Sequence, residues 1–392
     1  MKPVRIGLVG SQFVSTIHAE ALKRVPAAEL FAVASPSGDH AEQFAARHGI
    51  SRHFRDFRKM LEAPEIEMVV LGCPNSLHCE FTELAAAAGK HVVCEKPLCL
   101  NLREADRMIG ACRKANVKLM YAEELCFTPK YVRLKKLLDD GALGRPYLVK
   151  QAEKHDGPHS AWFWEVRESG GGVTLDMGCH AFEFFRWLLG KPDSARRQAH
   201  STESQTQSHE APLGEIVPLR KPRAVSVYAD MGTFVHKERT EGDDQSVVIV
   251  RFATDEGEVV GMAEESWAKK GGMDDTAEVH GSGGVAYADL LQGNAILTYS
   301  ELGYAYAVEK AGLTRGWSFT AFEEIWNYGF PQEFAHFVDC VANDKQPLET
   351  GDDGRAVLEI ILAAYASAGS GKRIDLPFQT DARRPIDLWK AI

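Results

Sequence analysis

Short apolar runs alternate with amphipathic stretches through the first third of the chain. Segments between the runs carry apolar residues at helical spacing, as in Ser15–Val25 and Leu102–Ala115. Buried strands separated by amphipathic helices are typical of βαβ units, in which the strands run parallel. The runs expected to form strands are Val4–Gly10, Leu30–Ala34, Met68–Cys73, His91–Cys94 and Lys118–Tyr121. Right-handed crossovers between such strands predict a doubly wound, Rossmann-type domain over residues 1–124.

Residues 125–392 follow a different pattern. From Ala224 to about Tyr306, apolar and polar residues alternate, which predicts the strands of a half-buried antiparallel sheet. Helical spacing occurs in four other segments, Lys130–Asp139, Asp176–Leu189, Gln332–Ala342 and Gly354–Ala368. We therefore expect a second, α+β domain with a large, mostly antiparallel open sheet, and we expect this domain to bind the substrate.

One segment fits neither domain. Asp193–Leu219 is rich in Ser, Gln, His and Glu and has few large apolar residues, so it can bury little surface. Lys191-Pro192 before it recurs as Lys221-Pro222 after it. This pattern predicts an exposed insertion, spanning residues 193–219, between two ends that would otherwise join.

Composition narrows the class of protein. With 392 residues the chain exceeds what one core comfortably fills, and its formal net charge of −10 disfavours binding to a nucleic-acid backbone. We see no signal peptide and no apolar stretch of about 18 residues, so we expect no membrane span. The eight cysteines form no C-x-x-C pair, which indicates reduced thiols and a cytoplasmic protein.

The turn after the first strand has part of a dinucleotide fingerprint. Of the pattern G-x-G-x-x-G only the first glycine, Gly10, is present, whereas Gln12 and Ser15 occupy the other two positions. The strand before and the helix after it still place free N–H groups, at Phe13 and Val14, where a pyrophosphate would bind. The sequence also allows an ordinary strand-to-helix turn here.

The end of the second strand bears on the choice of cofactor. Ser35, which follows that strand, is a candidate ribose contact, and residues 35–39 contain neither an early acidic residue nor an Arg or Lys. An acidic residue would hold the ribose 2′-OH of NAD, and a basic one would favour NADP. We expect NAD, and NADP is not excluded.

Three separated motifs now coincide. They are Pro74-Asn75-Ser-Leu-His78, Glu95-Lys96-Pro97 and Gly170-Gly-Gly-Val-Thr-Leu-Asp176-Met-Gly178-Cys-His180. Together with the closing Gly351–Arg355 helix start, they resemble the Gfo/Idh/MocA family of NAD(P)-dependent sugar and cyclitol dehydrogenases. The resemblance covers nearly the whole chain, and it implies hydride transfer to or from a sugar-like substrate.

The resemblance also implies site residues. Cys73, Pro74, Asn75 and His78 would lie beside the nicotinamide half of the cofactor, with Glu95 and Lys96 at the carboxyl ends of the strands. Lys96, Asp176 and His180 match the family's catalytic positions. The family forms dimers or tetramers through the open sheet faces of its second domain, so a homodimer or homotetramer is expected.

These residue types suit the chemistry. Removing hydride from a carbinol carbon requires that the hydroxyl proton also leaves, so a base must lie within reach of it. An imidazole such as that of His180 has an ordinary pKa of about 6.5. Asp176, four residues earlier, would project from the same helix face, where it could orient the imidazole or anchor a neighbouring substrate hydroxyl. Lys96 can stabilise a developing alkoxide or act as the base. The sequence leaves open which of Lys96 and His180 is the base.

Two further features have several interpretations. His155 and His159 could supply metal ligands, grip the substrate or form a plain turn. The aromatic run Trp162–Trp164 could stack on a sugar or form interdomain core. We assign no metal, and we keep His155 and Trp164 as candidates for substrate contact.

Three functions are compatible with these residues. The leading one is a dehydrogenase or reductase of a monosaccharide, glycoside, sugar acid or inositol. The alternative is an NAD-dependent glycoside hydrolase, which oxidises its substrate transiently and shows no net redox change. A non-catalytic dinucleotide sensor is the third, and the presence of Lys96, Asp176 and His180 argues against it.

Overall fold

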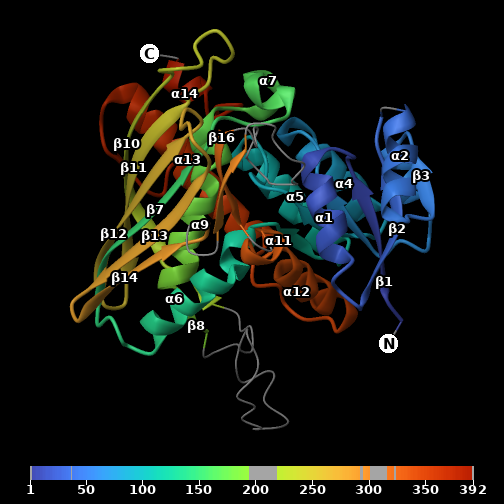
Figure 1. The fold of residues 1–392 in the computed structure, drawn as a ribbon, viewed down its shortest axis with the longest axis horizontal. Helices are drawn as coiled ribbons and strands as arrows, with labels where there is room; N and C mark the ends of the chain where they lie inside the picture. Colours follow the sequence, from blue (N-terminus) through green and yellow to red (C-terminus); the bar gives the residue numbers. More distant parts are fainter. Residues whose placement is uncertain are drawn as a thin grey trace.

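The chain folds into two lobes that lie side by side (Figure 1). The structure is a computed structural model, and it describes residues 2–36, 38–193, 219–291, 295–300, 316–321 and 324–390. Within these residues no helix is both long and apolar enough to cross a membrane. The first lobe contains the N-terminal sheet and the second a larger sheet, and the last long helices of the chain contact both.

A parallel sheet of six strands forms the first lobe. Its order is β3-β2-β1-β4-β5-β6, and every neighbouring pair is parallel. The strands are β1 (Val4–Val9), β2 (Ala28–Ala34), β3 (Arg52–Phe54), β4 (Met68–Leu71), β5 (His91–Cys94) and β6 (Leu119–Tyr121). This order confirms the predicted doubly wound fold, with its topological switch point between β1 and β4. The short, exposed β3 was not predicted, because it has no apolar run.

Helices on both faces of this sheet follow the amphipathic stretches. They are α1 (Phe13–Leu22), α2 (Gly38–His48), α3 (Phe57–Leu61), α4 (His78–Ala87) and α5 (Leu102–Lys114). In α5 the side chain of Asn101 caps the N-terminus by accepting from the Glu104 N–H, and Arg113 and Lys114 lie in the last turn. Local sequence signals therefore define this helix at both ends.

The second lobe is built on a seven-stranded sheet of order β14-β13-β7-β12-β11-β10-β17. Its strands are β7 (Pro146–Lys154), β10 (Arg223–Gly232), β11 (Gln245–Thr254), β12 (Gly257–Ser266), β13 (Asp274–Gly281), β14 (Gly284–Asp289) and β17 (Ile374–Asp375). One pair, β7 and β12, is parallel, and the others are antiparallel. The prediction of a mostly antiparallel sheet is confirmed. A separate pair of strands, β15 (Ala295–Ser300) and β16 (Gly316–Ala321), is also antiparallel.

Four long helices follow the first sheet, and the last two of them contact the first lobe. They are α6 (Pro129–Asp139), α9 (Gly178–Leu189), α12 (Phe330–Ala342) and α13 (Gly351–Ser370). Helix α12 returns to the first lobe, where the Phe334 ring meets the His18 ring of α1 edge-on at 5.1 Å. Helix α13 packs between α5 and β10. The chain from 125 onward thus completes the surroundings of the first sheet.

The helix predicted over Asp176–Leu189 is interrupted. Val173–Asp176 forms a separate short helix, α8, and α9 begins at Gly178 after Met177. Asp176 and His180 therefore belong to two helices rather than to one face of a single helix.

The ends of the predicted insertion meet. Lys191–Pro192 (β8) pairs with Leu219–Arg220 (β9) in a two-stranded antiparallel ladder. Residues 194–218 lie outside the described residues. The pairing agrees with the expectation that the flanking ends adjoin each other.

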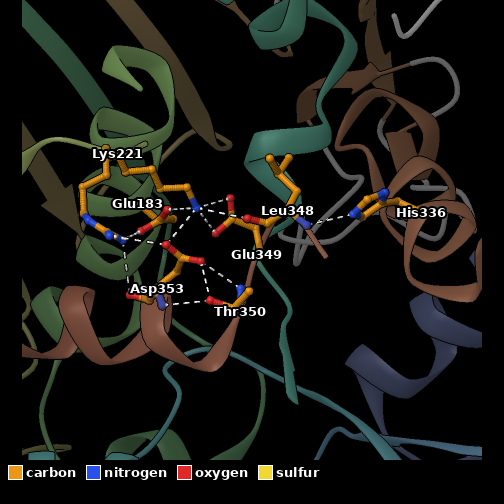
Figure 2. A network of polar contacts seen from close by, with 8 residues as sticks. Glu183, Lys221, His336, Leu348, Glu349, Thr350 and Asp353 are labelled. Atoms are coloured by element: carbon orange, nitrogen blue, oxygen red, sulfur yellow. Dashed lines mark hydrogen bonds and ion pairs between the residues drawn. The ribbon is translucent and has the colours of Figure 1, made fainter. Parts of the chain in front are cut away.

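A buried ionic network lies beside this ladder (Figure 2). Lys221 Nζ lies 2.7 Å from Glu183 Oε1, 2.8 Å from Glu349 Oε1 and 3.1 Å from Asp353 Oδ1. Burial alone would lower the pKa of Lys221, but the three carboxylates raise it above its ordinary value. Because Arg186 of α9 also pairs with Glu183 and Asp353, the network joins α9 to the start of α13.

Lys221→Met should lower the free energy of unfolding by about 3–5 kcal/mol, because it removes the cation that pairs with the buried Glu349 and leaves Glu183 and Asp353 with Arg186 alone. Chemical denaturation measures the change. Lys136→Met is the matched control, since Lys136 pairs with Asp140 on an exposed face of α6 and should change stability by about 0.5 kcal/mol or less. Equal stabilities of the two variants would contradict this account of the network.

Candidate active site

A cleft of about 450 Å³ runs between the lobes at the carboxyl ends of β1, β4 and β5. This is the edge at which open parallel sheets bind their ligands. The first lobe contributes most of the wall, including Gly10, Ser35 and Lys96. The second lobe contributes residues 158–160, Trp162, Phe163 and Asp176, and Phe330 of α12 closes one side.

The glycine turn is tightly packed. Gly10 has φ of +105°, and a Cβ there would lie 2.4 Å from the Gly72 carbonyl oxygen after β4. Only glycine allows β1 and β4 to approach in this way. The turn leads into α1, whose first N–H groups have no partner within the helix and so can bind an anion. Gln12, Phe13 and Val14 line the cleft at this helix end, as predicted.

Gln12 and Phe13 also meet the second lobe. Ser160 Oγ donates to Gln12 Oε1 at 3.3 Å, and the Phe13 ring lies 5.3 Å from the His159 ring. Residues 158–163 therefore lie across the entrance above the glycine turn. Gln12, which replaces the second glycine of the fingerprint, thus accepts a hydrogen bond from the second lobe.

The far end of the cleft contains a feature that the sequence did not reveal. Ser35 receives a hydrogen bond from Ser11 Oγ at 2.9 Å, and Arg55 and Arg58 also line this end of the cleft. Both arginines follow β3, which pairs with β2 and so brings them beside Ser35. The segment after β2 has no basic residue, but the neighbouring strand provides two.

Of the four residues predicted to contact the cofactor after β4, three line the cleft and one does not. Cys73, Pro74 and Asn75 line the cleft, and Asn75 Nδ2 donates to the Ser169 carbonyl of the second lobe at 2.8 Å. His78 does not line it. Its ring is fully buried, with Nδ1 3.0 Å from the Pro97 oxygen and Nε2 3.0 Å from the Cys73 oxygen. His78 thus fastens the loops after β4 and β5 to each other from behind the wall.

An ion pair joins the lobes inside the cleft. Lys96 Nζ donates to Asp176 Oδ1 and to the Asp176 carbonyl oxygen, both at 3.0 Å, and Trp267 Nε1 donates to Asp176 Oδ2 at 3.2 Å. Although burial works against the ammonium, the charge of Asp176 holds the pKa of Lys96 well above its usual range. The charge of Asp176 therefore favours the ammonium form of Lys96.

The segment that carries Asp176 is held by close backbone contact. Asp243 accepts from the backbone N–H groups of Gly172 and Thr174 and from the Thr174 hydroxyl. A Cβ at Gly172 would lie 2.0 Å from the Asp243 carbonyl oxygen, so the glycine run before Asp176 is needed for this approach. Contacts within the second lobe thus hold the glycine run that leads into Asp176.

His180 is buried at the start of α9, next to the cleft residue Glu124. Its side chain is nearly fully buried, and its Nδ1 is 2.7 Å from Glu123 Oε1, while Nε2 is 3.9 Å from Glu124 Oε1. The predicted orienting role of Asp176 is wrong for this reason: Asp176 pairs with Lys96, and Glu123 holds the imidazole. Glu124 lines the cleft in front of His180.

Glu95 lines the cleft as predicted, and two donors engage it. His18 Nε2 lies 2.7 Å from Oε1, and the Lys96 backbone N–H donates to Oε2 at 3.1 Å. Burial would raise the pKa of Glu95, but the His18 hydrogen bond and the charges of His18 and Lys96 bring it below its ordinary value.

The aromatic run reaches the cleft through residues other than the predicted one. Trp162 and Phe163 line it, with their rings stacked at 3.8 Å. Trp164 points into the core, where its ring lies 5.2 Å from that of Trp267. His155 is also fully buried and does not line the cleft, whereas His159 does. The short helix η3 (Ala161–Trp164) turns consecutive side chains in different directions, which an extended reading of the sequence misses.

Family models match both lobes. The model described as an oxidoreductase family with an NAD-binding Rossmann fold matches residues 4–123, and the model of that family's C-terminal alpha/beta domain matches residues 135–376. The chain belongs to the Gfo/Idh/MocA oxidoreductase family. It is an NAD(P)-dependent oxidoreductase, as the motifs predicted.

Relatives in this family match over nearly their whole length. Myo-inositol 2-dehydrogenase of Thermotoga maritima is 27% identical, covering 95% of this chain and 98% of the relative. The NAD(+)-dependent scyllo-inositol 2-dehydrogenase of Bacillus subtilis is 28% identical, with 97% of each covered. Among solved structures, GenD2 from gentamicin A biosynthesis in complex with NAD has a TM-score of 0.82 at 28% identity, covering 96% and 97%.

The geometry fits the family's dinucleotide. Gly10 makes the tight turn after β1, and the N-terminus of α1 opens to the cleft beside it. Gly10, Gln12, Phe13 and Val14 would hold the pyrophosphate, and Ser35 the adenosine ribose. Cys73, Pro74, Asn75, Glu95 and Lys96 would line the nicotinamide end.

We expect NAD to bind more tightly than NADP. Arg55 and Arg58 should make the difference between the two affinities smaller, because they can bind the 2′-phosphate of NADP. The double variant Arg55→Ala, Arg58→Ala should weaken NADP binding about tenfold, because a 2′-phosphate loses charge-assisted contacts, and NAD binding less than threefold. Calorimetric titration with both nucleotides measures the two affinities. Equal losses for NAD and NADP would show that the arginines do not face a 2′-phosphate.

Proposed function

We propose that this enzyme transfers hydride between nicotinamide and a carbinol carbon of a sugar, glycoside, sugar acid or inositol. The observation that carries the proposal is the Lys96–Asp176 pair, which fixes an ammonium in the cleft between the cofactor-binding lobe and the second lobe. The substrates named for the inositol dehydrogenase relatives support the choice of a polyol.

Lys96 and Asp176 have distinct roles in this proposal. Two of the three ammonium N–H donors of Lys96 point to Asp176, which leaves one for the substrate oxygen. A cation fixed in a partly dehydrated site stabilises the negative charge that develops as the hydroxyl is deprotonated. The bound nicotinamide supplies the hydride acceptor or donor. Asp176 keeps Lys96 charged and aimed, and Trp267 in turn holds Asp176.

Trp162 and Phe163 support a carbohydrate as the substrate. Their stacked rings form an apolar part of the wall in the same cleft as Lys96. Aromatic faces offer a flat surface for the C–H groups of a sugar ring, while the ionic groups take its hydroxyls. We do not extend the proposal to net glycoside hydrolysis, since no observation in the described residues favours it.

Lys96→Met should lower kcat about 10²- to 10³-fold, the range for losing one oxyanion-stabilising donor, while cofactor binding changes much less. Steady-state kinetics with NAD and a panel of inositols, sugars and sugar acids provides the test. Lys90→Met is the matched control, because Lys90 is also a buried lysine next to β5, but it donates to the carbonyls of Ala63 and Ile66 outside the cleft.

Two results would contradict the proposal. If wild-type protein forms no NADH with any member of the panel, the proposed class of substrate is wrong. If Lys96→Met and Lys90→Met both keep kcat within about threefold of wild type, Lys96 does not stabilise the developing negative charge.

We also propose that the enzyme is a cytoplasmic homo-oligomer that uses the uncovered face of the second sheet. All eight cysteines are free thiols, which supports a reducing compartment. A row of side chains crosses the sheet in register on that face: Tyr228, Ile249, Met262, Lys150, Glu278 and Tyr287. Apolar residues flank a central Lys150–Glu278 pair of 3.0 Å, an arrangement that can meet its own copy across a two-fold axis.

Ile249→Asp should shift the protein toward monomer, because it places a charge in the apolar part of this row. Light scattering after size-exclusion chromatography gives the mass. Lys59→Glu, an exposed change on α3, should leave the mass unchanged. A wild-type monomer, or an Ile249→Asp variant with wild-type mass, would exclude this face as the interface.

A further inference from the structure

One carboxyl group in the wall of the cleft has no hydrogen-bond donor among the described residues. Glu124 begins the short helix η2 (Glu124–Phe127) after β6, lines the cleft and is only 6% exposed. The basic atom at salt-bridge distance from its carboxylate is His180 Nε2, at 3.9 Å. Glu95 and Asp176, the other carboxyl groups at this end, accept the hydrogen bonds described above. A buried polar group that faces a cleft without a donor indicates a ligand that supplies one.

The backbone around Glu124 is held on both sides. Thr128, after η2, donates through Oγ1 to the Tyr328 carbonyl at 2.9 Å. Glu123, before it, lies 2.7 Å from His180 Nδ1 through its Oε1. These two contacts fasten the ends of the short segment, and Glu124 between them faces the cleft.

The charges around Glu124 favour a cation at this end of the cleft. Burial raises the pKa of Glu124 well above its usual range, and the charges of Glu123 and Glu95 raise it further. The opposing charges of His180 and Lys96 do not offset these effects. A ligand with a positive charge would restore the carboxylate form, whereas an anionic ligand would add to the repulsion.

An ammonium group satisfies Glu124 better than a hydroxyl group does. A hydroxyl can donate a hydrogen bond, but it leaves the buried negative charge without a cation, which is costly. An ammonium group supplies the donor and the charge together. Trp162 and Phe163, in the same wall, add stacked aromatic rings that attract a cation as well as the C–H face of a sugar.

We propose that Glu124 binds an ammonium group of the substrate, so that the preferred polyol is an amino sugar or an amino cyclitol. This inference rests on the proposed polyol oxidation and names the substrate class within it. Lys96 and His180 remain available to the carbinol that is oxidised. The ammonium group lies on a carbon close to that carbinol, because Glu124 Oε1 is 3.9 Å from His180 Nε2. Glu124 is thus assigned to specificity and not to the transfer of hydride or proton.

The first test compares amino sugars with their neutral parents. Oxidation by NAD is measured with 2-amino-2-deoxyglucose, 3-amino-3-deoxyglucose and an aminodeoxyinositol. Each is measured beside its hydroxyl parent and its N-acetyl derivative, and glucuronate is the anionic member. At least one amine should exceed its parent and its N-acetyl derivative about 10- to 100-fold in kcat/KM, the range for one hydrogen bond to a charged group. Glucuronate should be the poorest substrate.

Glu124→Gln should lower kcat/KM for the preferred amine about 10- to 100-fold and change kcat/KM for its neutral parent less than threefold. Calorimetric titration of the NADH-bound protein with the same amine should show the same loss of affinity without turnover. Glu333→Gln is the matched control, since Glu333 is also a buried carboxyl group but does not line the cleft. This control should keep the preference for the amine within threefold of wild type.

The possible failures can be told apart. Neutral parents that are oxidised as well as every amine overturn the ammonium site and leave the polyol oxidation standing. An equal loss for amine and parent in Glu124→Gln also overturns it, because Glu124 would then serve a step common to all substrates. If no compound forms NADH, the proposed function fails, and the titration still decides on Glu124. Amines that bind the NADH-loaded wild type no more tightly than their N-acetyl derivatives exclude an ammonium site.

Discussion

A single ion pair across the interlobe boundary sets the character of this site. Lys96 belongs to the loop after β5, and Asp176 ends a short helix of the other lobe, so the pair forms only when both lobes are in place. A buried cation without its partner is costly, and so is the lone carboxylate. The attraction between the two charges therefore also fixes the position of one half of the cleft relative to the other.

Excess negative charge is the second feature of the site. Glu95, Glu123, Glu124 and Asp176 surround one lysine, and burial raises the pKa of both Glu123 and Glu124. Such a cluster is stable only if some of its members hold protons or face a cation. Both carboxyl groups therefore favour the protonated form more than an exposed glutamate does.

The sequence predicted what is encoded locally. Apolar runs located five of the six strands of the first lobe, and the motifs located Gly10, Lys96 and Asp176 at the cleft. Features that depend on neighbouring strands were missed: Arg55 and Arg58 reach the cleft because β3 pairs with β2. The catalytic set remains a proposal, yet its geometry differs from expectation, because the break after Asp176 turns His180 toward Glu123. Adjacent acids at the end of the last strand, Glu123 and Glu124, were a readable signal.

The return of the chain to the first lobe has a consequence for how the protein folds. Helix α12 covers α1, which lies more than 300 residues earlier, and Leu358 and Leu362 of α13 belong to the same apolar cluster as Leu98 and Tyr121. Contacts between such distant residues close late, since a long loop must be ordered first. During synthesis the nucleotide-binding lobe therefore emerges with part of its core open. It acquires its final stability only when the last fifth of the chain has left the ribosome.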